Sequence, residues 1–160
     1  MNGYAESSRF ADAYDQTYDV FLSHSFADAI FVYGVKKLLE SHDVSVYVDW
    51  ENDSGLDRRR VTKDTAALLR HRMKHSKSLL LATSENASNS KWMSWELGYF
   101  DGLKSRCAIF PTNPTQLEAH VFEGREYLGL YPYITKLEDR GGTERLWVID
   151  EQGNYVRLDN

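Results

Sequence analysis

Short apolar runs alternate along this chain with segments of helical spacing, and this alternation constrains the fold more than any other feature. The run at residues 78–83 is continuously apolar at its centre, as in a parallel strand covered on both faces. Comparable runs occupy residues 18–23, 44–50 and 107–110. Strands that alternate with helices predict an α/β fold with a doubly wound, flavodoxin-like parallel sheet and helices on both faces.

The remaining segments complete this expected arrangement. Helices are predicted at residues 27–41, 62–75 and 92–104. A short fifth strand is predicted at 127–131, followed by a β-hairpin at 146–158 that turns at 152–154. We expect the hairpin to be an appendage to a five-stranded sheet. The expected regions are therefore an N-terminal leader (1–17), one α/β domain (18–135) and a C-terminal extension packed on that domain (136–160).

Size and charge narrow the classes of partner. A chain of 160 residues fits one domain, and its net charge of −5 argues against nucleic acid. No apolar run is long enough to span a bilayer, and the N-terminal residues lack the apolar centre of a signal peptide. We therefore expect a cytosolic protein without a membrane partner. The one cysteine, Cys107, lies in an apolar run and is expected to be buried.

Several α/β enzyme classes lack their motifs here. Neither a dinucleotide-binding glycine fingerprint nor a P-loop follows an expected strand, and no hydrolase nucleophile elbow is present. The first strand ends in Ser23, His24 and Ser25, rather than in the acidic residues of a phosphoacceptor domain. His71 and His75 are four residues apart, but cationic residues adjoin them, so no metal site is expected. Those cations are Arg72, Lys74 and Lys77.

Trp92 and Glu96 form a W-x-x-x-E motif at the start of an expected helix. Four-residue spacing places the indole and the carboxylate on one helical face, where they could hold a flat, cationic ligand. The alternative is structural, with the tryptophan packed in the core and the glutamate at its solvated edge. The motif also occurs in unrelated bacterial effectors.

Three stretches in order resemble Toll/interleukin-1 receptor (TIR) domains: residues 18–25, the loop after Val48, Asp49 and Trp50, and residues 78–100. The resemblance covers about residues 18–131. It implies an enzyme that cleaves NAD⁺, with Glu96 as the catalytic residue and Trp92 as the ring against which substrate packs. NAD⁺ would be the substrate, and no separate cofactor is expected.

The residue chemistry agrees with that implication. Nicotinamide in NAD⁺ is already a cationic leaving group, so one fixed carboxylate that stabilises an oxocarbenium-like sugar suffices. Further substrate-binding candidates follow the first three strands, at the edge where open α/β sheets bind ligands: Ser23, Phe26, Asp49, Trp50 and Ser84. For each of them, capping or packing is the alternative. The triplet at 58–60 is either a pyrophosphate contact or a solvated cluster of arginines.

The leading interpretation is a stand-alone bacterial TIR enzyme of antiviral defence, as in Thoeris systems. Such an enzyme would release nicotinamide and a linear, cyclic or conjugated ADP-ribose signal for a separate effector. The polar loop at 51–60 is a candidate lid or self-association surface. Two alternatives stay open: a non-catalytic TIR adaptor that docks through this loop, and a nucleoside deoxyribosyltransferase whose glutamate is a nucleophile.

Overall fold

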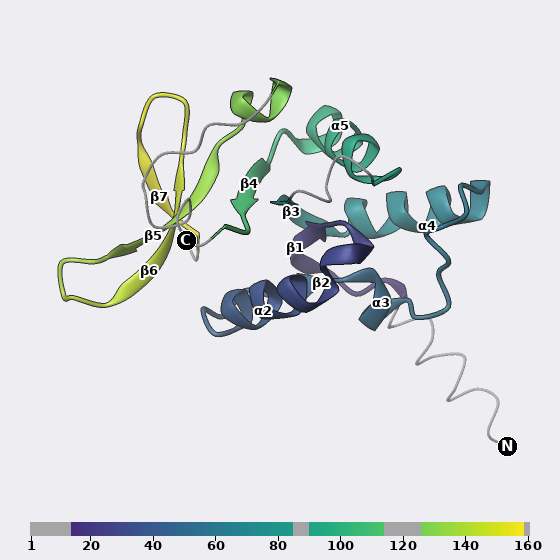
Figure 1. The fold of residues 1–160 in the computed structure, drawn as a ribbon, viewed down its shortest axis with the longest axis horizontal. Helices are drawn as coiled ribbons and strands as arrows, with labels where there is room; N and C mark the ends of the chain where they lie inside the picture. Colours follow the sequence, from purple (N-terminus) through teal and green to yellow (C-terminus); the bar gives the residue numbers. More distant parts are fainter. Residues whose placement is uncertain (1–13, 85–89, 114–125, 159–160) are drawn as a thin grey trace, which may run out of the picture.

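A seven-stranded sheet runs through the centre of the described part of the molecule (Figure 1). The computed structural model describes residues 14–84, 90–113 and 126–158. The strands, in the order β2-β1-β3-β4-β5-β6-β7 across the sheet, are β2 (Val46–Tyr47), β1 (Tyr18–Ser23), β3 (Ser76–Thr83), β4 (Cys107–Pro111), β5 (Tyr133–Glu138), β6 (Glu144–Ile149) and β7 (Tyr155–Arg157). The helices are η1 (Phe26–Asp28), α2 (Ala29–Glu40), α3 (Asp49–Asn52), α4 (Lys63–Lys74), α5 (Met93–Lys104) and η3 (Glu126–Leu130).

The first five strands form the parallel sheet that the sequence predicts. β1 pairs in parallel with both β2 and β3, β3 pairs with β4, and β4 pairs with β5. The register places Val20 beside Val46 and Leu80 beside Ala108. Because all five strands point the same way, their carboxyl ends meet at one edge, and the loops that leave this edge form the candidate site.

Helices cover both faces, which confirms the doubly wound prediction. Helix α2 packs on one face against Leu80 and Ala82, whereas α4 and α5 pack on the other against Leu79 and Leu81 (Figure 1). Side chains alternate between the two faces along β3, so a strand covered twice must be apolar throughout. Its central residues, 79–82, are all buried.

Two sequence predictions about the strands are wrong. Residues 127–131 do not form the fifth strand: Glu126–Leu130 is a 3₁₀ helix, and β5 begins after Pro132. Proline has no N–H to donate to a ladder, but the carbonyl oxygen of Pro132 accepts a hydrogen bond from the amide of Ile109 at 2.8 Å and so starts the pairing. The second strand is also shorter than the predicted 44–50, because Asp49–Asn52 turns into the short helix α3.

The C-terminal hairpin exists as predicted, with Gly153 at a φ of 77° in its turn, but it is not an appendage. β6 pairs antiparallel along the full length of β5, from Tyr133 opposite Ile149 to Glu138 opposite Glu144. The sheet of the described residues therefore continues to seven strands instead of five. The boundary predicted at residue 135 falls inside β5.

Within the described ranges, no helix is both long and apolar enough to cross a membrane. Of the expected leader, residues 1–13 lie outside the described residues. Tyr14 stacks on His71 of α4 with ring centroids 3.8 Å apart, which holds this segment against the domain before β1 begins.

A pair of substitutions tests whether β6 belongs to the core. Leu146 of β6 is buried in the same apolar cluster as Leu80 and Ile134. We expect Leu146→Ala to lower the free energy of unfolding by about 2–5 kcal/mol, since it leaves a cavity in the core. The matched control Val156→Ala changes an exposed residue of β7 and should stay within about 0.5 kcal/mol. Equal, small effects in urea denaturation would mean that the hairpin is an accessory element.

Candidate active site

Glu96 lies in the first turn of α5 and points toward the end of β1. Ser90 caps this turn, because its Oγ accepts hydrogen bonds from the amides of Trp92 and Met93, both at 3.3 Å. The Glu96 side chain is fully buried. Its Oε2 accepts a hydrogen bond from Oγ of Ser23, the last residue of β1, at 2.5 Å. Two of the predicted site residues are thus in direct contact.

Arg58 joins this carboxylate to a second one. Its Nη2 donates to Oε1 of Glu96, and its Nη1 lies 3.2 Å from Oδ2 of Asp49. The Arg58 side chain is 12% exposed and that of Asp49 is 7% exposed, so the bridge is almost closed to water. A guanidinium presents its donors in a plane, which suits a bridge between two carboxylates.

Burial and Arg58 act in opposite directions on Glu96. Burial raises the pKa of Glu96 above its usual range, whereas the Arg58 guanidinium and the Ser23 hydroxyl oppose that rise. Burial also disfavours the charged guanidinium, but Glu96 and Asp49 outweigh it and raise the pKa of Arg58. Arg58 therefore stays cationic and is the group that favours an ionised Glu96.

His24 and Trp50 continue the cluster on the far side of Asp49. His24 donates from Nδ1 to the carbonyl oxygen of Leu22 at 2.9 Å, which leaves Nε2 to accept the indole N–H of Trp50 at 3.3 Å. That Nε2 lies 3.5 Å from Oδ1 of Asp49. Oδ1 of Asp49 is buried and receives no hydrogen bond from the described residues. It is an acceptor ready for a donor such as a sugar hydroxyl.

Trp92 lies next to the cluster, but its ring is packed rather than open. It is 5% exposed, and its indole N–H donates to the carbonyl oxygen of Arg58 at 2.7 Å. Trp95 meets it edge-on, with ring centroids 5.4 Å apart. In this conformation Trp92 fixes the backbone of Arg58, and its expected contact with substrate stays a prediction.

Phe26 and Ser84, the two other predicted site residues, make none of the described contacts within this cluster. Phe26 is 75% exposed at the start of η1. Ser84 donates from Oγ to Asp28, which connects the end of β3 to η1. The predicted residues that the structure brings together are Glu96, Ser23, Asp49, Trp50 and Trp92.

Sequence reasoning did not include His24 among the site residues and did not identify Arg58 as the partner of Glu96. Both left a signal. His24 sits between two serines at the end of a strand whose carboxyl edge was already the expected site. A carboxylate buried on a helix requires a cation, and the arginine triplet at 58–60 lies in a loop at the same edge.

Residues of the domain line two hollows, and Glu96 lines neither of them. One of about 660 Å³ is lined by the first residues of β1, β3 and β4, at the edge opposite the carboxyl ends. The other, of about 430 Å³, separates the loop at 53–62 from the start of α4. The second hollow borders that loop on one side, and Arg58 of the same loop lies beside Glu96.

Comparisons with known proteins identify the family of this chain. The family model described as "Thoeris protein ThsB, TIR-like domain" matches residues 21–116, which include every member of the Glu96 cluster. A protein of Bacillus cereus (strain MSX-D12), named "Probable 3' cyclic ADP-D-ribose synthase ThsB'", is 49% identical over 147 residues, 91% of this chain and 76% of that protein.

Two further matches are more distant. "Putative cyclic ADP-D-ribose synthase TIR2" of Cytobacillus dafuensis is 34% identical over 85 residues, 52% of this chain and 22% of that protein. The TIR domains of the activated Roq1 resistosome align with a TM-score of 0.44 and 20% identity, over 66% of this chain and 65% of that one. Since the family model spans more than half of the chain, the protein belongs to the ThsB family of Thoeris proteins and carries its TIR-like domain.

Proposed function

We propose that this protein cleaves the nicotinamide–ribose bond of NAD⁺ and closes the ADP-ribose product into a ring. The observation that carries the proposal is the fully buried Glu96, located at the carboxyl edge of the sheet and paired with a cation. The names of both curated relatives, cyclic ADP-D-ribose synthases, support the reaction, and the relative at 49% identity supports a 3′ cyclic product.

The reaction needs little beyond a fixed negative charge. When the glycosidic bond breaks, its electron pair goes to the nicotinamide nitrogen, which becomes neutral, and positive charge develops on the ribose. Glu96 stabilises that charge. A hydroxyl of the adenosine ribose then attacks the same carbon and loses its proton as the ring closes. Oδ1 of Asp49, buried and without a hydrogen bond from the described residues, is the acceptor that receives that proton.

Arg58 occupies the place that this positive charge would take. Its flat, delocalised cation lies against both carboxylates, so substrate reaches Glu96 only after the guanidinium moves away. Once displaced, Arg58 is free to meet the pyrophosphate, the role for which the sequence made it a candidate.

The cellular setting is part of the same proposal. We place the enzyme in the cytosol, in antiviral innate immune signalling, with a separate effector that responds to the product. Its substrate is NAD⁺, and it requires no additional cofactor for the chemistry. Protomers self-associate through TIR–TIR contacts that include the loop at 51–60.

Glu96→Gln tests the catalytic carboxylate. The change keeps the shape and removes the charge, so we expect NAD⁺ turnover to fall at least ~100-fold. Product masses separate nicotinamide with cyclic ADP-ribose from nicotinamide with linear ADP-ribose. Glu138→Gln, on the exposed end of β5, is the control and should retain full turnover.

Three results would contradict this assignment. Turnover above about a tenth of wild type in a folded Glu96→Gln variant would remove Glu96 from the mechanism, given the loss expected for such a group. A wild-type protein that consumes no NAD⁺ at any concentration would indicate the adaptor function. A sugar covalently bound to Glu96 would indicate the deoxyribosyltransferase mechanism.

Arg58→Ala tests the electrostatic role of the cation. Glu96 must be ionised to act, so activity is present above its pKa and is lost below it. Without the guanidinium, the strongest influence opposing the burial that raises this pKa is lost, and the acid limb of the pH–rate profile should move to higher pH. Arg58→Lys keeps a positive charge and should therefore cause a smaller shift than Arg58→Ala. Arg59 pairs only with Asp57 among the described contacts, so Arg59→Ala should cause no shift.

Thermal denaturation accompanies that measurement, because removing one partner of a buried ion pair also destabilises the fold by about 3–5 kcal/mol. If the alanine variant unfolds, the lysine variant is measured instead. Its ammonium compensates Glu96 less well than the planar guanidinium, so the acid limb should still move to higher pH, by a smaller amount. An acid limb that stays in place in a folded Arg58→Ala protein would show that Arg58 does not act on Glu96.

Self-association predicts that turnover per protomer rises with protein concentration, because mass action favours the assembled state. Ser54 is exposed in the loop and is a suitable position to disturb, whereas Asp53 is bound to Arg72 and must be kept. Ser54→Arg should abolish the concentration dependence without lowering the melting temperature. Constant turnover across a wide dilution series of the wild type would show that each monomer carries a complete site.

A further inference from the structure

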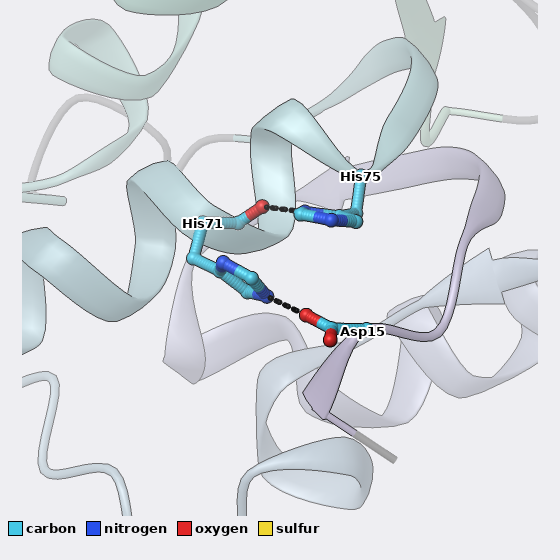
Figure 2. A group of neighbouring side chains, drawn as sticks. All are labelled: Asp15, His71 and His75. Carbon is cyan, nitrogen blue, oxygen red and sulfur yellow. Dashed lines mark hydrogen bonds and ion pairs between the residues drawn. The ribbon is translucent and has the colours of Figure 1, made fainter. Parts of the chain in front are cut away.

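Three potential metal ligands gather where α4 ends, far from Glu96 in the fold. Asp15 precedes β1, and His71 and His75 lie one turn apart at the end of α4 (Figure 2). One ligand atom of each residue lies within 4.8 Å of the other two. Oδ1 of Asp15 is 3.5 Å from Nε2 of His71, and the two imidazole centroids are 4.1 Å apart.

His75 is already oriented as a metal ligand usually is. Its Nδ1 donates to the backbone carbonyl oxygen of His71 at 2.9 Å (Figure 2). A neutral imidazole that donates from Nδ1 carries its lone pair on Nε2. Metal-binding histidines typically fix their second nitrogen by such a bond to a carbonyl, which sets the tautomer and the ring orientation.

Nε2 of His71 can become available to a metal without leaving a neighbouring group unsatisfied. Its Nε2 lies 2.9 Å from the carbonyl oxygen of Tyr14, to which it donates. That carbonyl oxygen also accepts a hydrogen bond from Nη1 of Arg72 at 2.7 Å. When the ring proton moves to Nδ1 and a metal binds at Nε2, the Tyr14 carbonyl oxygen keeps the Arg72 donor and is not left unsatisfied.

The nearby cations, which argued against a metal in the sequence, are mostly neutralised in the fold. Arg72 donates to both carboxylate oxygens of Asp53, each at 2.8 Å, and Lys77 pairs with Asp19 at 2.7 Å. Lys74 is exposed to solvent, which screens its charge. The cluster also lies at the carboxyl end of α4, where the helix dipole favours positive charge.

We propose that Asp15, His71 and His75 bind a divalent transition metal, with Zn²⁺ as the best match. Two imidazoles and one carboxylate suit zinc, whereas calcium and magnesium prefer oxygen ligands. Water would complete the tetrahedron. The metal joins the segment before β1 to the end of α4, at the amino edge of the sheet, and so takes no part in the chemistry at Glu96.

The test uses the untagged chain, stripped with a chelator and titrated with ZnCl₂ in a calorimeter. We expect one zinc ion per chain and a melting temperature that rises with zinc concentration. His71→Ala, His75→Ala and Asp15→Asn should each weaken binding at least ~10-fold. Binding should also weaken as the pH falls, because a metal competes with protons for its ligand atoms. NAD⁺ turnover is not the readout, so failure of the catalytic proposal leaves this test intact.

His42→Ala is the control, since His42 follows α2 and lines the hollow at the strand starts. It should leave zinc affinity unchanged. Equal zinc affinity in the wild type and in the His71→Ala and His75→Ala variants would overturn the site. The site would also be overturned if the variants lost stability by the same amount with and without zinc. That result would indicate only an Asp15–His71 ion pair.

Discussion

The buried bridge between Arg58, Glu96 and Asp49 is the interaction on which the arrangement of this edge depends. Two carboxylates lie side by side with almost no access to water, which is costly unless a cation compensates for both. Arg58 is that cation, and Trp92 holds its backbone through the indole N–H. A single guanidinium therefore ties together helix α5, the loop before α4 and the start of α3.

Under the proposed function, one arrangement would serve both stability and catalysis. A site that stabilises a positive charge on a sugar must hold a negative charge away from water, and that charge destabilises the empty protein. Here the protein supplies its own cation. In the proposed mechanism, the charge that NAD⁺ brings offsets the cost of moving Arg58, so the same carboxylates would be compensated before and after binding.

The sequence predicted most of the parallel sheet because its signals are local. The apolar run at 78–83 and the hairpin turn at 152–154 each depend on signals within a few residues. The predictions that failed depend on contacts between residues far apart in the sequence. Whether β6 extends the sheet depends on pairing with β5, and whether 127–131 forms a strand depends on where Pro132 meets β4. Likewise, spacing placed Trp92 and Glu96 on one face, but only the fold shows that Arg58 lies against both.

Two arginine–carboxylate pairs divide the loop before α4 into fixed and movable parts. At its start, Asp53 accepts two hydrogen bonds from Arg72 and one from Tyr47 at 2.7 Å, and these partners overcome the effect of burial and lower its pKa. At its end, Oγ1 of Thr62 caps α4 by accepting from the amide of Thr65 at 3.1 Å. Between these anchors the chain at 54–61 is held inward by the Arg58 side chain and by Leu56, which packs against the apolar cluster beneath α4 and α5. Because the two ends and Leu56 stay in place, release of the Arg58 side chain would limit the opening of the site to a local movement and leave the sheet unchanged.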